Sequence, residues 1–337
     1  MKTHQLVLLF IFIALLLVSA CKKHDGNDLV KSEIYTLQLN DITNTDAILR
    51  LNCVIGKEKI KSLGFKWKKT SENNFNIETV TVNPGISTFP IKNLVEDAEY
   101  LVRAFMVVFS GDTVYGKNDV SFRTHGTMTD IDGNTYFTMR YGEKVWMTNN
   151  LRVTRYADGT ELESRSEGVG AFTDRQVYFY DSFHRPFIMD PNYGLLYNWA
   201  AAVRVDSCNY LVNFDPTTYV QGICPDGWHI PSSDEWSSIT SRYRGYEMKT
   251  ANWTEGTYAS NNYSQFSAEP AGYYNCDIGV LETFLTVGDG AYFWTTTARK
   301  KTDNTLVFTY RLYSNYPDIH LKPDFKQTGY SVRCVKD

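Results

Sequence analysis

The sequence of 337 residues contains no long run of lysine or arginine, and its 34 basic and 38 acidic residues give a net charge of −4. A protein that follows a phosphate backbone needs clustered positive charge, so nucleic acid is not an expected partner. The apolar run 6–18 is also too short for a permanent membrane span, because a helix needs about 20 apolar residues to cross a bilayer.

Patterns that support enzyme chemistry are missing as well. The stretch 224–236, CPDGWHIPSSDEW, concentrates a cysteine, a histidine and three acidic residues, but no second histidine stands three or four residues from His229. A metal-binding histidine pair on this element is therefore not supported. A glycoside hydrolase needs two carboxylates that face each other across a cleft, and no spacing of acids selects such a pair. We predict a protein that is not an enzyme and carries no cofactor.

The same stretch contains ordinary signals for a turn followed by a helix. Residues 225–227 have the chemistry of a tight turn, and Ser232 with Glu235 fits a capping box. Gly245 can end the helix. We predict a hydrogen-bonded, structural role for His229 rather than a catalytic one. The predicted structural motif consists of Gly227, Trp228, His229, Pro231, Ser232, Glu235 and Trp236.

Asp130, Asp132 and Asn134 carry side-chain oxygens at alternate positions, and this pattern suggests a calcium site. A helix-flanked calcium loop continues with further acidic ligands and a closing glutamate, and this segment lacks them. We therefore favour a turn over a metal site. The surrounding residues predict a hairpin in which Gly133 and Gly142 supply the two reversals of the chain.

The first 21 residues have the layout of an export signal. Basic residues precede the apolar run, and the ending VSAC resembles the lipoprotein box of bacteria. That resemblance implies a signal peptide over 1–20, an acylated Cys21, a tether over 21–29, and an outer-membrane lipoprotein that faces the surface or the periplasm. Several acyl chains would hold it on the membrane, because each buried methylene contributes about 0.8 kcal/mol. The alternative is a soluble secreted protein with an incidental cysteine.

The other cysteines belong to a chain that is expected to enter a compartment where disulfides form. Cys53 lies in the first predicted domain, and the four cysteines of the second domain allow three pairings. We favour Cys224 with Cys334, because alternation in the last predicted strand points Cys334 at the core. Cys208 and Cys276 are then either a second pair or two buried thiols, and Cys53 stays unpaired.

Residues 30–125 predict an all-β sandwich. Short alternating runs are separated by turn residues at intervals of about eight to twelve, which is typical of sandwiches. In YLVRAFMVVF, alternate residues from Tyr100 to Met106 share the expected inner face of a core strand. The phrases TDAILRLNC, GFKW, IKNLVEDAEYLVRAF and YGKNDVSFRT resemble fibronectin type III-like repeats of bacterial surface proteins, in which Leu94 and Tyr100 would flank a turn. The resemblance implies a spacer or docking module.

A small, polar boundary at 124–130 leads into the second domain, 127–337. Six blocks resemble, in this order, the Fibrobacter succinogenes major paralogous domain of exported proteins from Bacteroidetes and Fibrobacteres: DIDGNTYFTMRYGEKVWMTNNL, YGLLYNWAAAV, GICPDGWHIPSSDEW, FSAEPAGYYN, YFWTTT and GYSVRCVKD. The order of GWHIP, a helix, FWTTT and a closing SVRC strand is similar to C-type lectin-like folds, including relatives that build formylglycine-generating enzymes. The resemblance implies an α+β domain of this type.

The sequence lacks two functional motifs of the lectin-like relatives, and this limits the functions that the resemblance implies. Calcium-dependent lectins use a Glu-Pro-Asn or Gln-Pro-Asp triplet together with Trp-Asn-Asp, whereas this chain has Glu269-Pro270-Ala271 and no Trp-Asn-Asp. Calcium-dependent sugar binding is therefore not implied. Formylglycine-generating enzymes use a closely spaced cysteine pair near the end of the domain, and only Cys334 lies there.

Three functions fit these observations. The first is a non-catalytic binding or adhesion module for a glycan or protein; the others are a structural component of the envelope or a surface appendage, and an enzyme related to formylglycine-generating enzymes. We place binding first, because flat aromatic side chains in loops stack on sugars and anchor protein interfaces. The candidate ligand-binding aromatics, each of which packing could also explain, are Trp253, Tyr273, Tyr274 and Tyr292.

Overall fold

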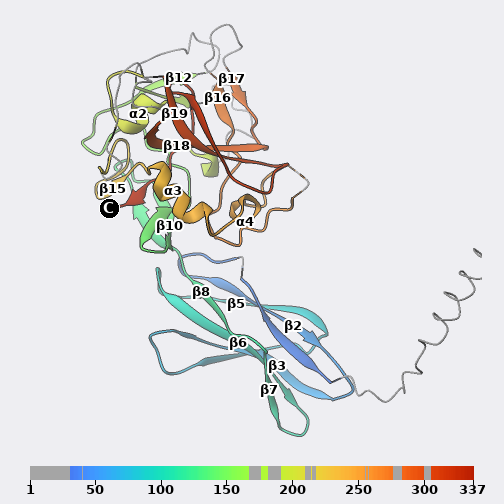
Figure 1. Ribbon diagram of the computed structural model, residues 1–337. Helices are drawn as coiled ribbons and strands as arrows, with labels where there is room; N and C mark the ends of the chain where they lie inside the picture. Colours follow the sequence, from blue (N-terminus) through green and yellow to red (C-terminus); the bar gives the residue numbers. More distant parts are fainter. Residues whose placement is uncertain are drawn as a thin grey trace, which may run out of the picture.

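The protein is mostly β, with an antiparallel N-terminal region followed by a β-rich C-terminal domain (Figure 1). The computed structural model describes residues 31–39, 41–166, 176–180, 191–208, 214, 218–254, 256, 258–275, 283–299 and 305–337. The predicted signal peptide, Cys21 and the tether lie outside these ranges. Within them, no helix has the length and apolarity that a membrane crossing requires.

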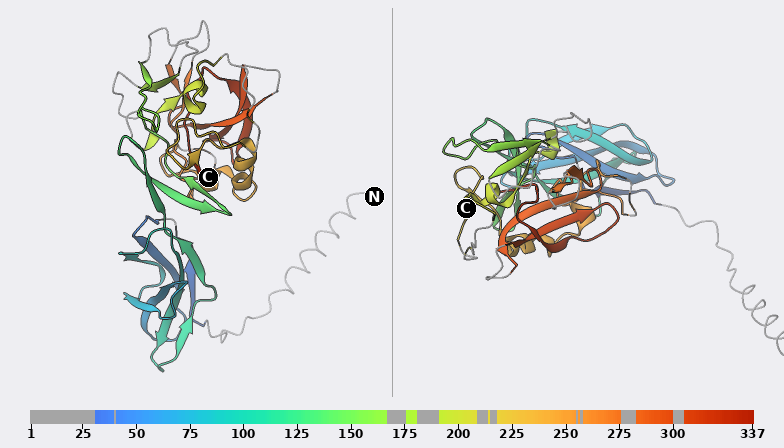
Figure 2. Two further views of the ribbon diagram at one scale, coloured as in Figure 1. Left: turned by 90° about the vertical axis from the view of Figure 1, so that its left-hand side faces the viewer. Right: turned by 90° about the horizontal axis from the view of Figure 1, so that it is seen from above.

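Two antiparallel sheets build the N-terminal region and enclose one core. The first sheet has the order β1-β2-β5, and the second has the order β4-β3-β6-β7, with β8 also paired to β6. The strands are β1 (Glu33–Leu37), β2 (Ala47–Val54), β3 (Ile60–Lys69), β4 (Asn76–Val80), β5 (Gly85–Ile91), β6 (Glu99–Val108), β7 (Thr113–Tyr115) and β8 (Val120–Arg123). This region and the C-terminal domain are stacked end to end (Figure 2).

Strand β6 confirms the predicted core strand. Tyr100, Val102, Ala104 and Met106 point into the core, and none is more than 3% exposed. The Tyr100 hydroxyl accepts a hydrogen bond of 2.8 Å from the Val95 N–H, which ties the preceding turn to the strand. A tyrosine that bonds back to the turn before its strand is a recurrent feature of sandwich domains.

Four sheets occur in the described part of the C-terminal domain. Their orders are β15-β21-β11-β10-β9, β12-β13-β14, β16-β17 and β18-β19-β20, and β12 with β13 is a parallel pair. The strands are β9 (Gly126–Thr129), β10 (Thr135–Tyr141), β11 (Lys144–Met147), β12 (Glu163–Ser166), β13 (Val177–Tyr180), β14 (Leu196–Tyr197), β15 (Trp228–His229), β16 (Tyr273–Asn275), β17 (Thr283–Leu285), β18 (Gly290–Ala298), β19 (Leu306–Tyr313), β20 (His320–Phe325) and β21 (Val335–Lys336).

The helices of this domain are short. They are the 3₁₀ helix η1 (Pro191–Tyr193) and the α-helices α2 (Trp199–Val203), α3 (Ser233–Thr240) and α4 (Gly245–Met248). All five residues of α2 are buried, and Trp236 and Ile239 bury one side of α3. The predicted α+β domain is therefore β-rich, with short helices of at most eight residues packed against its sheets.

The hairpin predicted around Asp130, Asp132 and Asn134 is present as β9, β10 and β11. Gly133 and Gly142 have φ values of 82° and 61°, which glycine adopts readily. Asp130 Oδ1 accepts hydrogen bonds of 2.9 Å from the backbone N–H groups of Asp132 and Asn134. These bonds hold a turn, as predicted, and across the described ranges no group of three or more His, Cys, Asp or Glu is arranged to hold a metal ion.

Helix α3 begins as predicted but ends earlier. The Ser232 side chain accepts from the Glu235 N–H, and the Glu235 carboxylate accepts from the Ser232 N–H at 3.0 Å, which completes the capping box. Three serine hydroxyls then bond to carbonyls three residues earlier and compete with the helical backbone. The prediction that Gly245 ends this helix is wrong. Gly245 begins α4, where a Cβ would lie only 2.8 Å from Asp318 O.

The predicted disulfide between Cys224 and Cys334 is confirmed. Their Cα atoms are 5.9 Å apart, and the bridge joins residues 110 positions apart in the sequence. Cys53 is a buried free thiol, as predicted, and burial raises its pKa. Cys208 is buried with its Sγ 3.3 Å from a backbone carbonyl. Cys276 lies outside the described residues, so both alternatives for these last two cysteines stay predictions.

Candidate functional site

His229 on β15 is 1% exposed, and both of its ring nitrogens face carboxylates. Nδ1 lies 2.7 Å from Asp337 Oδ1, and Nε2 lies 2.9 Å from Glu235 Oε1. The imidazole also stacks on the ring of Tyr219, with the centroids 4.1 Å apart. A catalytic base must reach a substrate proton. Because the protein's own carboxylates and a tyrosine ring surround this histidine, the geometry supports a structural role.

Glu235 connects His229 to the start of α3. Its Oε1 lies 3.2 Å from Lys144 Nζ, and its Oε2 accepts from Ser232. Burial alone would raise the pKa of Glu235, but the hydrogen bonds from His229, Ser232 and Lys144 outweigh burial and lower the pKa to about 2. The carboxylate therefore stays ionised at neutral pH and serves as an acceptor that braces the helix start.

Two of the four candidate aromatics are packing residues. Trp253 is 8% exposed, and its indole N–H donates to Ala268 O at 2.8 Å. Tyr274 is fully buried, and its ring meets Phe284 at a centroid distance of 5.2 Å. Because core contacts take up both rings, neither offers a face to a ligand.

The other two candidates line a cavity of about 270 Å³. Tyr273 belongs to β16 and Tyr292 to β18, strands that lie close together with β19 in the upper part of Figure 1. The centroids of Tyr273 and Tyr292 are 4.9 Å apart. Tyr330 stacks on Tyr292 at 5.2 Å, and Tyr313 meets Tyr292 edge-on at 5.8 Å. We call this cavity, with its four tyrosine walls, the tyrosine pocket.

An ion pair lies in the lining of the tyrosine pocket. Arg311 Nη2 donates to Asp324 Oδ2 at 2.6 Å, and the Tyr330 hydroxyl donates to the same oxygen. Burial alone would lower the pKa of Arg311, but Tyr330 and Asp324 beside it raise the pKa instead. The pair brings N–H donors and oxygen acceptors into the pocket without net charge.

Asn275 and Thr328 complete the polar lining of the pocket. Each is no more than 5% exposed. An amide and a hydroxyl can both donate and accept hydrogen bonds. Together with the ion pair and the tyrosine rings, they form a small enclosure that suits a molecule with several hydroxyl groups.

The antiparallel register of β18, β19 and β20 positions these groups. Tyr292 pairs with Arg311, and Arg311 pairs with His320, so the three side chains stand in one row on one face of the sheet. Gly290 leaves room for the tyrosine ring, because a Cβ at this position would lie 2.7 Å from it. A larger residue at 290 would push Tyr292 out of the pocket wall.

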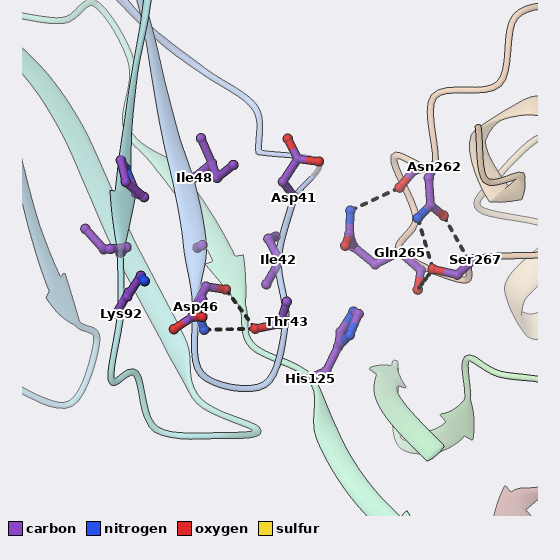
Figure 3. A pocket seen from close by; sticks show the side chains of 13 residues that line it. Asp41, Ile42, Thr43, Asp46, Ile48, Lys92, His125, Asn262, Gln265 and Ser267 are labelled. Carbon is purple, nitrogen blue, oxygen red and sulfur yellow. Dashed lines mark hydrogen bonds between the residues drawn. The ribbon is translucent and has the colours of Figure 1, made fainter. Parts of the chain in front are cut away.

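A second cavity, of about 480 Å³, lies between the N-terminal region and a loop of the C-terminal domain (Figure 3). Asp46 and Lys92 line it from one part, and Asn262 and Gln265 from the other. His125, between β8 and β9, is 5% exposed, and neither ring nitrogen has a hydrogen-bond partner within the described ranges. Burial lowers the pKa of His125 to about 4, so this residue is neutral at neutral pH.

Sequence reasoning missed the ion pair of the tyrosine pocket. Arg311 stands in the strand LVFTYRLY, where a cation among apolar residues signals a buried charge that needs a partner. Asp324 carries no such signal, because its partner lies 13 positions away across the β19–β20 hairpin. His125 was missed as well, because the burial of its imidazole depends on contacts between the two parts of the chain.

The fold and the site define a two-part, disulfide-bridged β protein whose C-terminal domain carries a polar pocket walled by tyrosines. The chain belongs to the family of the Fibrobacter succinogenes major domain, whose model matches residues 139–336. The match confirms the family resemblance of the C-terminal domain.

Solved structures show weaker likeness. The sensor domain of the anti-sigma factor RsgI4 in Pseudobacteroides cellulosolvens is 15% identical, with 28% of this chain and 93% of that chain covered and a TM-score of 0.23. A myokine structure is 15% identical, with 27% and 95% covered and a TM-score of 0.24. TM-scores this low carry no argument about fold or function. No curated protein matches the chain.

Proposed function

We propose that this chain is a non-catalytic binding protein of the bacterial envelope, whose C-terminal domain binds a neutral glycan in the tyrosine pocket. The observation that carries the proposal is the Arg311–Asp324 pair set among four tyrosine rings. Aromatic faces stack on the apolar side of a sugar, and mixed donors and acceptors bind its hydroxyls. Because the pair has no net charge, it favours a neutral ligand over an anion.

The site offers less support for catalysis. The described lining of the tyrosine pocket includes one carboxylate, Asp324, and neither a thiol nor an imidazole. Glycoside hydrolysis uses two carboxylates on either side of the bond that breaks. His229 lies elsewhere, held between Glu235 and Asp337.

The proposal includes export and a lipid anchor at Cys21, with the chain at the outer membrane. The Cys224–Cys334 disulfide supports export, because such bridges persist in oxidising compartments. We assign the N-terminal region the finer class of a fibronectin type III-like spacer, supported by its two facing sheets and the bond between Tyr100 and Val95. We assign the C-terminal domain a C-type lectin-like fold.

An array of neutral and acidic glycans, probed with the purified chain, tests the proposal, and calorimetry with the best neutral sugar follows. Asp324→Asn keeps the shape of the side chain but removes the charge that pairs with Arg311. We expect it to weaken binding by about tenfold, the effect of losing one charged hydrogen-bonding partner. The matched control is Asp119→Asn, which removes the carboxylate of the exposed pair with Arg103 in the other part of the chain.

Retention on neutral sugars, lost in Asp324→Asn and kept in the control, supports the proposal. Two results contradict it: no retention on any neutral glycan, or full affinity in a folded Asp324→Asn variant. Near-ultraviolet circular dichroism reports whether each variant keeps its packed aromatic core.

A further inference from the structure

Aromatic side chains continue from the tyrosine pocket around the end of the β19–β20 hairpin. Tyr313 lines the pocket, and its ring centroid lies 5.8 Å from that of Tyr316 and 5.5 Å from that of His320. Tyr316 and His320 meet edge to face at 5.2 Å. We call Tyr313, Tyr316 and His320 the aromatic strip. Exposure increases outward, from 3% at Tyr292 in the pocket to 54% at Tyr316.

A buried lysine holds the backbone of the strip. Lys249 Nζ donates to Tyr313 O at 2.6 Å and to Tyr316 O at 3.2 Å, and the whole residue is buried. Because one ammonium group binds both carbonyls, the turn between the two tyrosines is fixed before any ligand arrives. A surface that is ordered in advance loses less conformational freedom on binding.

His320 adds a polar group to the strip. In the described structure its Nε2 is buried without a hydrogen-bond partner. A buried polar atom without a partner costs free energy, and a ligand hydroxyl would recover that cost only after the rings of Tyr313 and Tyr316 moved aside to expose it. His320 also pairs with Arg311 across β19 and β20, so the strip and the ion pair of the pocket share one face of the sheet.

From this continuity we infer that the ligand is a linear, neutral oligosaccharide rather than a single sugar. One unit occupies the tyrosine pocket, and the following units lie along the aromatic strip, stacked on Tyr313 and Tyr316. The inference rests on the proposed function, since it takes the pocket to be a glycan site. A single sugar in the pocket would leave the exposed ring of Tyr316 without a ligand contact.

The competing occupant is an acidic chain. Lys322 is exposed on the same face of β20 and could attract a carboxylate outside the pocket. The pocket itself favours a neutral unit, because Asp324 already balances Arg311. A comparison of neutral with acidic oligosaccharides separates these two occupants.

Calorimetry with neutral gluco-, manno- and xylo-oligosaccharides, from monosaccharide to hexasaccharide, tests the inference. We expect the affinity to rise roughly tenfold from the monosaccharide to the trisaccharide, which matches about one added aromatic stacking contact, and then to level off. Tyr316→Ala should remove this gain and leave the monosaccharide affinity unchanged. Tyr115→Ala, at an exposed tyrosine of the N-terminal region, is the matched control and should change neither value.

The outcomes separate the inference from the proposed function. Monosaccharide binding without a gain with length, or a gain that Tyr316→Ala retains, overturns the role of the strip and leaves the pocket as a glycan site. Tighter binding of oligouronic acids than of neutral chains overturns the neutral ligand. If the wild-type chain binds no sugar of any length, the proposed function fails and the inference fails with it.

Discussion

The imidazole of His125 lies 5.4 Å from the ring of Phe137, centroid to centroid, where the two parts of the chain meet. Burial lowers the pKa of His125 to about 4, against about 6.5 in an unfolded chain. The unfolded chain therefore binds more protons between these pH values. The neutral imidazole of His125 therefore stabilises the fold fully above pH 6.5. As the pH falls through 4, the free energy of unfolding should decrease by about 3 kcal/mol.

Urea unfolding at a series of pH values from neutral to 4 measures this loss. His125→Leu has no imidazole to protonate, so we expect its free energy of unfolding to change much less over the same range. An equal pH dependence in the two proteins would show that His125 is not the group responsible.

Glu235 should act in a lower pH window. Its pKa is lowered to about 2 from 4.5, so its ionised form stabilises the fold fully above pH 4.5. As the pH falls from 4.5 through 2, protonation should remove about 3 kcal/mol of stability. Glu235→Gln should be less stable than wild type at pH 7, and the difference should shrink below pH 3. A constant difference across this range would contradict the assignment.

The disulfide should contribute strongly to stability. Cys224 and Cys334 close a loop of 110 residues, which corresponds to nearly 5 kcal/mol in the chain-entropy description. The double variant Cys224→Ser, Cys334→Ser should therefore unfold at much lower urea concentration than wild type, and dithiothreitol should lower its stability less than that of wild type. Cys53→Ser, at the buried free thiol, serves as the control, because its response to dithiothreitol should match that of wild type.

Lys249→Met should reveal how the aromatic strip is held in place. The change leaves the carbonyls of Tyr313 and Tyr316 without their donor, which should cost about 2 kcal/mol of stability. Trisaccharide affinity should fall several-fold and by more than monosaccharide affinity, because Lys249 holds both Tyr313 in the pocket wall and Tyr316 outside the pocket. Calorimetry on the folded variant checks both values, and an unchanged trisaccharide affinity would show that the lysine does not position the strip.

Local chemistry explains which parts of the fold could be predicted. The capping box of Ser232 and Glu235, the turns at Gly133 and Gly142, and the inward face of β6 each depend on residues a few positions apart. The end of α3 was mispredicted because the glycine at 245 is required by the close approach of the distant Asp318 backbone and not by the end of that helix.

The tyrosine pocket depends on contacts that sequence spacing does not reveal. Tyr273 and Tyr292 were both candidates, but nothing local indicated that β16 and β18 bring their rings together. Strand register places Arg311 opposite Tyr292. The β19–β20 hairpin then brings Asp324 back to the same face of the sheet. Tyr274, next to Tyr273, points into the core because successive residues of a strand face opposite sides.

The bridge between Cys224 and Cys334 encloses the whole tyrosine pocket in one covalent ring, since the lining residues run from Tyr273 to Tyr330. If a protease outside the cell cut a single peptide bond anywhere in that ring, the two fragments would stay linked by sulfur. Both halves of the pocket could then remain folded against each other. A nicked molecule should therefore keep all the lining residues of the pocket in one covalently linked unit, which would suit the exported location proposed above.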